Sequence, residues 1–197
     1  PALNHRIHAF VFILIVAFAS HAIDVQVTAT GGLSGPNCGS TVGDACGSLS
    51  DAWSACQSSA SEPCNMYLQP GHYVGPYNTG LYFGSAVISI VGVDKSGNTI
   101  LDGEGSHSGF SSTGSITLDG LVLQNCINSA LAWAPTVSQS LLEVSNCTFA
   151  GNQGSSGGAL WLQPTASIIK AVLNASFIGN VANGYGGAIY AAAAGVS

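Results

Sequence analysis

Charged side chains are scarce in this chain of 197 residues, where Asp, Glu, Lys and Arg together make up 6% of the sequence. Soluble domains usually carry roughly a quarter. So little charge excludes a coiled coil, a salt-bridged helical bundle and an electrostatic binder of nucleic acid. Met occurs once and Lys and Arg three times together, so several residues that favour helices are also rare. We therefore expect neither an all-helical fold nor a nucleic-acid partner.

Glycine and apolar residues take the place of the missing charges, with 26 glycines and an apolar fraction of 47%. That apolar fraction is not typical of a disordered chain, and the length suits one domain with a core of its own. Glycine together with abundant Ser and Asn favours tight turns between short strands. The composition predicts a β-rich, turn-dense and weakly acidic domain.

Residues 1–22 have the pattern of a secretory signal peptide. A short polar start with Arg6 precedes the apolar run from Ala9 to Ala19, which is shorter than the ~20 residues of a spanning helix. A small-x-small cleavage pattern ends at Ala22. We predict that residues 1–22 are removed and that the mature chain is secreted or displayed at the cell surface, without a transmembrane segment.

Six cysteines in a secreted chain favour disulfides over metal binding or redox chemistry. Six cysteines allow 15 pairings, and proximity along the chain is the guide that we use. It suggests the pairs Cys38–Cys46 and Cys56–Cys64, which leaves Cys126 and Cys147 for each other.

Internal repeats carry most of the structural information. Residues 149–161 (FAGNQGSSGGALW) and 177–190 (FIGNVANGYGGAIY) share Phe, x, Gly, Asn, and then Gly-Gly-Ala, an aliphatic and an aromatic residue. The interval between the two glycine pairs is longer by one than the interval between the two phenylalanines, so the second copy contains one insertion.

Shorter segments also repeat. The interval between the phenylalanines recurs between 87–92 and 115–120 and between 142–147 and 170–175, whereas 121–126 precedes its copy at 142–147 by a shorter interval. All these intervals lie in the range of roughly 20–30 residues that is typical of a solenoid.

Apolar and polar residues alternate within these segments, as at Ile116 and Leu118, which is the period of a strand. Short strands followed by Gly, Asn and Ser turns predict an all-β fold, a right-handed parallel β-helix whose coils stack about 4.8 Å apart. Equivalent residues then form ladders along the axis. We expect Asn125, Asn146 and Asn174 to form one of them.

The two Gly-Gly-Ala segments resemble the repeat of the chlamydial-type polymorphic outer membrane proteins. Most of residues 23–190 is also similar to the start of a pectin-lyase-like β-helix, with a Val-rich strand at 23–30, a Cys-rich loop at 37–49 and YLQPGHYVG at 67–75. The resemblance implies a β-helix over residues 23–197, continued by further coils in a longer chain. It implies little about activity, because this fold hosts many functions.

One segment, Ser50 to Ala60, has the apolar face and first-turn Asp of a helix. We expect Ser50 to be its N-cap. Because the first coil of a solenoid exposes its core, this helix is expected to cover that end, with Trp53 as a packing residue.

Catalysis has few candidate residues. A lyase of this fold needs Ca²⁺-binding acids and a basic residue, but the mature chain lacks Arg, and Lys95 and Lys170 occupy turn-like or edge positions. Asp102 and Glu104 are the acidic candidates, for catalysis or a Ca²⁺ site, although the flanking glycines favour a structural turn. We therefore expect no catalytic residue, cofactor or metal here. The alternative is a polysaccharide lyase or glycoside hydrolase with its active site on further C-terminal coils.

Binding residues are the remaining candidates. Trp161 and Tyr190 occupy equivalent repeat positions and should stack, in the core, at an edge or as a glycan-binding stripe. Asn146 and Asn174 begin glycosylation sequons, although strand alternation would turn Asn146 inward unless a turn intervenes. The sequence favours a secreted or cell-surface β-helix with a structural, adhesion or glycan-binding role, whose partners are surface glycans or proteins.

Overall fold

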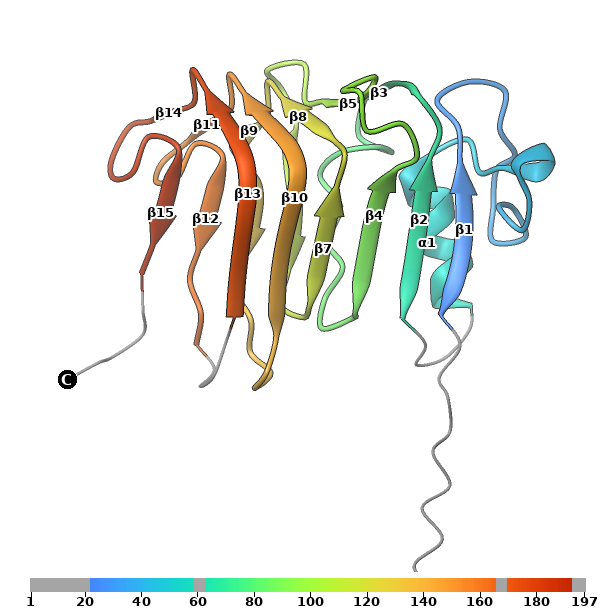
Figure 1. Ribbon diagram of the computed structural model, residues 1–197, viewed down its shortest axis with the longest axis horizontal. Coiled ribbons are helices and arrows are strands. Elements are labelled where there is room, and N and C mark those ends of the chain that lie inside the picture. The colour runs from blue at the N-terminus through green and yellow to red at the C-terminus, as the bar shows by residue number, and fades with distance from the viewer. Residues whose placement is uncertain (1–21, 59–62, 166–169, 193–197) are drawn as a thin grey trace, which may run out of the picture.

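A computed structural model describes residues 22–58, 63–165 and 170–192, and its strands stack side by side along one long axis (Figure 1). All strand pairings between the named strands are parallel. The predicted parallel β-helix with a short helix is confirmed. The elements are β1 (Ile23–Val27), the 3-10 helix η1 (Val42–Asp44), α1 (Leu49–Gln57), β2 (Cys64–Leu68), β3 (Gly71–Val74), β4 (Ile88–Gly92), β5 (Thr99–Asp102), β6 (Ser108–Ser112), β7 (Ile116–Asp119), β8 (Val122–Gln124), β9 (Ile127–Trp133), β10 (Leu141–Ala150), β11 (Gln153–Gly154), β12 (Leu160–Leu162), β13 (Lys170–Ile178), β14 (Val181–Ala182) and β15 (Ile189–Ala191).

The coils present three faces. Face 1 consists of β1, β2, β4, β7 and the first half of β10, and face 2 of β3, β5, β8 and the second half of β10. The long strand β10 joins the two faces into one sheet, and β13 pairs with it over both. Face 3 is a separate sheet in the order β6, β9, β12, β15, and the short β11–β14 ladder lies between faces 2 and 3 in the sequence.

The strand register confirms three of the predicted repeat alignments. Ile88 pairs with Ile116, and Phe149 with Phe177, at the interval that the sequence repeats share. After the glycine pairs, β12 and β15 align with the one inserted residue that the second copy contains. Repeated sequence segments therefore become neighbouring rungs of the same ladder.

The predicted alignment of 121–126 with 142–147 is wrong. It would place Leu142 beside Leu121, but Leu142 pairs with Ile116 of β7, and the second half of β10 pairs with β8. Segment 121–126 therefore begins face 2, whereas most of 142–147 lies on face 1. The alignment of 142–147 with 170–175 is also off by one residue, because it places Leu142 beside Lys170, whereas Leu142 pairs with Ala171.

A β-bulge at Asn146 causes this shift. The register between β10 and β13 breaks between Ser145 and Cys147, and Asn146 has a φ of 52°. An extra residue reverses the alternation of a strand. Asn146 is therefore exposed, while Val144 and Cys147 on either side of the bulge are both buried.

The predicted ladder of Asn125, Asn146 and Asn174 does not form; Asn125 (φ 51°) and Asn146 occupy left-handed turn positions, and Asn174 lies exposed on β13. An Asn ladder exists instead at the buried Asn152 and the partly buried Asn180, where the Asn152 backbone N–H and side-chain Nδ2 both donate to Oδ1 of Asn180, at 3.0 and 2.9 Å. These are the asparagines of the Phe-x-Gly-Asn repeat.

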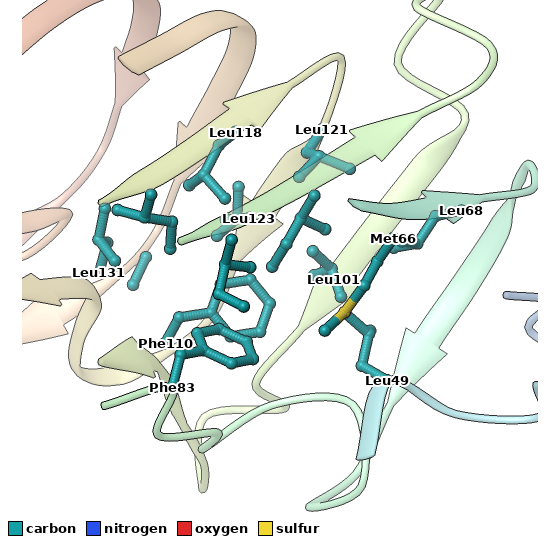
Figure 2. Close-up of a cluster of buried hydrophobic side chains, with 14 of the residues drawn as sticks. Leu49, Met66, Leu68, Phe83, Leu101, Phe110, Leu118, Leu121, Leu123 and Leu131 are labelled. Atoms are coloured by element: carbon teal, nitrogen blue, oxygen red, sulfur yellow. The ribbon is translucent and has the colours of Figure 1, made fainter. Parts of the chain in front are cut away.

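The core is a set of apolar ladders that run along the axis. On face 1, Met66, Ile90, Leu118 and Val144 occupy successive rungs and are all fully buried. Figure 2 shows such side chains from neighbouring strands converging on the interior. The ladder on face 2 ends in Phe149 and Phe177, whose rings stack with centroids 5.3 Å apart.

The loop that carries η1 lies beyond β1 at the N-terminal end of the coils (Figure 1), so the covering of that end by the helix stays a prediction. Helix α1 lies behind β1 and β2 and contacts both. Its N-cap is Ser48 rather than the predicted Ser50, because the Ser48 side chain accepts from the Asp51 N–H at 3.1 Å. The helix buries Leu49, and Trp53 packs edge-on against Phe83, with ring centroids 5.4 Å apart.

The two disulfides are Cys38–Cys46, which precedes α1, and Cys56–Cys64, which joins the last turn of α1 to the start of β2; these are the two pairs suggested by proximity. Residues 1–21 lie outside the described residues, so the signal peptide stays a prediction. Within the part of the chain that the structure describes, no helix is long and apolar enough to cross a membrane.

Candidate functional site

The acidic candidate Asp102 lies at the end of β5 and is 7% exposed. Its carboxylate receives hydrogen bonds from Gln124 Nε2 at 2.7 Å, the Glu104 N–H at 2.8 Å and Asn125 Nδ2 at 3.1 Å, and His72 Nε2 lies 3.1 Å away. Both carboxylate oxygens are thus occupied by groups of the chain itself. Asp102 fixes its own turn and joins it to the next coil.

Burial opposes ionisation of Asp102, but these hydrogen bonds outweigh it, so that the pKa of the carboxyl lies below its usual value. Glu104 follows in a left-handed conformation (φ 54°), with its side chain half exposed and 3.9 Å from His107. Asp102 bonds the backbone of Glu104, so these two candidates build a turn. Among the described residues, no three His, Cys, Asp or Glu side chains are placed to hold a metal ion.

A second aspartate, Asp119 at the end of β7, is engaged in the same way. Its carboxylate pairs with Lys95 and accepts from Asn146 Nδ2 at 2.8 Å. Burial opposes ionisation of Asp119 too, but Lys95 and Asn146 outweigh it and lower its pKa. Lys95 is therefore held as the partner of a carboxylate, and Lys170 lies exposed at the start of β13.

The lowered pKa of Asp102 leads to a prediction about acid stability. A carboxyl with a depressed folded-state pKa stabilises the fold above its unfolded pKa, and this stabilisation is lost as the pH falls through the folded pKa. We expect Asp102→Asn to lower the free energy of unfolding at neutral pH by about 1–3 kcal/mol. Between about pH 5 and pH 2, the free energy of unfolding of the variant should fall less than that of the parent chain. Urea unfolding across this range tests it. Asp24→Asn, at an exposed site on β1, is the control, and equal pH profiles for Asp102→Asn and the parent chain would contradict the prediction.

The predicted Cys126–Cys147 disulfide is not formed, and both thiols are free and buried. Its basis was the wrong alignment, since Cys126 follows β8 on face 2 and Cys147 follows the bulge in β10. Burial raises the pKa of Cys126 to about 12 and that of Cys147 to about 11. Both therefore pack as small apolar residues.

The sequon asparagines Asn146 and Asn174 are both exposed. The bulge turns Asn146 outward and so removes the conflict between strand alternation and an accessible sequon. Glycosylation at either residue stays a prediction.

The outer side of face 3 carries the aromatic residues. Trp161 and Tyr190 are register partners on β12 and β15, as their repeat positions predicted. Tyr185 stacks on Tyr190 with ring centroids 6.2 Å apart and is 72% exposed. Among the described residues no ring contact joins Trp161 to Tyr190, so the predicted stacking of this pair is not formed. Trp161 lies on the rung next to Tyr190, and we call the three side chains at the C-terminal end of the face the aromatic platform.

A fourth aromatic on this side, Tyr82, was missed in the sequence. It bridges to Ser111 of β6, and Ser111 pairs in turn with Ala132, the register partner of Trp161. Tyr82 is 61% exposed. The alternation of Leu81-Tyr82-Phe83, with Phe83 buried, is the signal in the sequence, but this segment has no recognisable repeat.

A hollow of about 320 Å³ includes Ser111 and Ala132, the two rungs between Tyr82 and Trp161. It is lined by Gly80, Ser108, Gly109, Phe110, Ser111, Asn128, Ser129 and Ala132. A second hollow of about 220 Å³ shares Asn128 and is lined by Ile127, Gln153, Gly154, Ser155, Val181 and Asn183. The two lie at the edge of face 3 nearest to β11.

Comparison with family models matches residues 174–192 to the Chlamydia polymorphic membrane protein (Chlamydia_PMP) repeat. The C-terminal coil is similar to a PMP repeat. The match runs from Asn174 in β13 to Ala192 after β15, and so includes the Phe-x-Gly-Asn and Gly-Gly-Ala elements. No curated protein and no solved structure matches the chain, and the resemblance to pectin-lyase-like proteins stays an expectation.

The structure gives the PMP repeat residues a physical role. The Phe stacks in the core, the Asn bonds the neighbouring coil, and the glycine pair forms the corner before face 3. All three elements hold coils together. The repeat match thus agrees with the β-helix, whereas the residues free to contact a partner lie on the outer sides of the strands.

Proposed function

We propose that this chain is a cell-surface adhesion module, which binds its partner through the outer side of face 3 and does not chemically change it. The observation that carries the proposal is the aromatic platform of Trp161, Tyr185 and Tyr190 beside an uncharged hollow. Exposed aromatics on a rigid sheet are favourable contact residues, because they supply a large area at a low cost in conformational entropy.

The surface location is supported by three features. The PMP repeat is that of a membrane-protein family, the two disulfides fit an oxidising compartment, and residues 1–22 have the pattern of a signal peptide. A rigid β-helix also suits adhesion, since it presents the binding face without a further cost of ordering when a partner binds.

Binding without turnover is supported by the state of the catalytic candidates. General acid–base catalysis requires a carboxyl free to exchange a proton with a substrate. The Asp102 oxygens are occupied by donors from neighbouring residues, and its lowered pKa is that of a poor proton donor at neutral pH. Lys95 is paired with Asp119.

An adhesion assay tests the proposal. Beads coated with the chain are allowed to settle on plates of cell-wall polysaccharide, matrix protein or cultured cells, and retention is measured under flow. We expect retention above that of uncoated beads on at least one surface and a loss of most of it in the double variant Trp161→Ser with Tyr190→Ser. The control is Tyr67→Ser on the outer side of face 1. Equal losses in the two variants, or no retention by the parent chain, would overturn the proposal.

A further inference from the structure

We infer that face 3 binds an uncharged glycan, laid along the axis of the β-helix from Tyr82 across the hollow to Trp161 and Tyr190. This inference rests on the proposed function and names the ligand class of the same site. It follows from the spacing of the aromatics, the polarity of the hollow and the distribution of charge.

The aromatic residues lie in one column. Tyr82, Ser111, Ala132, Trp161 and Tyr190 occupy successive rungs in that order. Parallel strands are about 4.8 Å apart, so the column extends over roughly 19 Å. Aromatics stand at its two ends, and the two central rungs carry small side chains. The column therefore has the form of a trough between two stacking platforms, which suits an extended ligand with flat apolar surfaces.

The floor and rim of the trough carry uncharged hydrogen-bonding groups. Asn128 lies at the junction of the two hollows and is exposed, with one weak contact to Ser108 at 3.4 Å. Among the described residues, no hydrogen bond engages the side-chain amides of Gln153 and Asn183. Each amide both donates and accepts, and so does each hydroxyl of a sugar. Apolar ligands such as lipid chains would leave these groups unpaired.

Charge distinguishes a neutral glycan from an acidic one. No strand of face 3 contains Asp, Glu, Lys or Arg, and neither hollow is lined by such a residue. The lysines of the described region, Lys95 and Lys170, lie beside face 1, and the described region contains no Arg. Carboxylate and sulfate groups are recognised by Arg and Lys, so this face offers a uronate or a sulfated glycan no counter-charge.

Intrinsic fluorescence provides a direct measurement, because the three tryptophans differ in position. Trp133 is fully buried and Trp53 packs against Phe83, whereas Trp161 lies on the outer side of face 3. The chain is titrated with soluble oligosaccharides of glucan, mannan and galactan, and in parallel with polygalacturonate and heparin. We expect a saturable change in tryptophan emission with at least one neutral oligosaccharide, of equal affinity at low and high salt.

Two variants locate the binding. Tyr190→Ser removes part of the platform, and Ser111→Glu places a carboxylate in the trough. Tyr190→Ser is expected to weaken binding about fivefold to tenfold, as for the loss of one aromatic contact. Ser111→Glu is expected to weaken it by at least as much, because the longer charged side chain occupies the trough, while Tyr67→Ser on face 1 binds like the parent chain. Circular dichroism establishes that each variant is folded. Because Ser111→Glu retains every aromatic, the test does not depend on the tolerance of the platform to substitution.

The outcomes separate this inference from the proposed function. Binding of a neutral oligosaccharide that is weakened by both face 3 variants supports it. Binding of polygalacturonate or heparin alone overturns it, and so does binding of no glycan in the panel. Adhesion to matrix protein that is lost in the face 3 double variant, without glycan binding, overturns the glycan inference but supports the proposed function. Glycan binding that is unchanged in both variants overturns the assignment to face 3.

Discussion

Replacing Asn152 by alanine is expected to lower the free energy of unfolding by about 3–5 kcal/mol. Asn152 is fully buried. Its Oδ1 accepts from the Cys126 N–H at 2.9 Å, and its Nδ2 donates to the Leu123 carbonyl and to Asn180 Oδ1, each at 2.9 Å. Alanine leaves the Cys126 N–H without a partner, at about 1–3 kcal/mol, and removes the bonds of the side chain to the Leu123 carbonyl and to Asn180, at about 1 kcal/mol each. The change is a large part of the roughly 5–15 kcal/mol that stabilises a typical domain.

Aspartate at position 152 distinguishes the contribution of the side-chain donor, Nδ2, from that of the side-chain acceptor, Oδ1. Asn152→Asp keeps the acceptor for Cys126 but directs a carboxylate at the Leu123 carbonyl and at Asn180 Oδ1. Burial and these acceptors raise the folded-state pKa of such a group. A group whose pKa is raised in the folded state stabilises the fold below its unfolded-state pKa, and this stabilisation is lost as the pH rises through the folded-state pKa. The deficit of the variant relative to the parent chain is therefore expected to be largest at neutral pH and to shrink on acidification.

Urea unfolding of both variants, each referred to the parent chain at the same pH, measures these effects. Asn65→Ala is the matched control, because Asn65 lies on the outer side of β2 and its side chain bonds to exposed Asp24. Its expected change is within about 0.5 kcal/mol. A similar loss in Asn65→Ala and Asn152→Ala would show that the ladder contributes nothing specific.

The coil architecture was predictable from the sequence because each repeated segment lies on top of its copy. Ile88 and Ile116 are equivalent in the sequence and adjacent in the sheet, and so are Phe149 and Phe177. Parallel in-register stacking preserves the sequence offset in space. Where two sequence segments are repeats of each other, the interval between them gives the register of the two strands that they form.

The position of the Asn ladder was not predictable in this way. Asn125 and Asn146 both precede a cysteine, and this local similarity suggested equivalent places in successive coils. They share a backbone conformation instead, with φ values of 51° and 52°, at two different corners of the coil. The next coil has Gly151 (φ 62°) at the corner of Asn125. Because Asn and Gly both tolerate the left-handed region, Asn in this sequence marks either a turn or a ladder.

The candidate site was only partly predictable for a related reason. Trp161 and Tyr190 follow the two glycine pairs, so their equivalence could be read from the repeats. Tyr82 joins the same column from a segment without a recognisable repeat. The hollow between them exists because the intervening rungs carry Ser111 and Ala132, whose sizes matter only once the register is known.

The first glycine of each Gly-Gly pair lies too close to a neighbouring backbone atom to carry a side chain. Gly157 and Gly179 have nearly the same left-handed backbone, with φ values of 64° and 60°. A Cβ on Gly179 would meet no atom within 4 Å, whereas a Cβ on Gly157 would overlap the carbonyl oxygen of Leu160. Gly186 in the next coil has the same conflict with Ile189. The first glycine of each pair is thus required by close backbone approach in addition to its φ.

We expect Gly179→Ala to cost about 1–2 kcal/mol, which is the penalty of the left-handed conformation. Gly157→Ala is expected to cost about 3–5 kcal/mol, because the overlapping atom is backbone and relief requires movement of β12. Chemical unfolding of the two variants measures the difference, and equal costs would contradict the steric argument. Since β12 carries Trp161, the movement in Gly157→Ala is also expected to weaken binding at face 3, whereas Gly179→Ala, with an open Cβ position, should leave binding intact. A Gly157→Ala chain that is destabilised but retains full adhesion would contradict the predicted effect of this corner on binding at face 3.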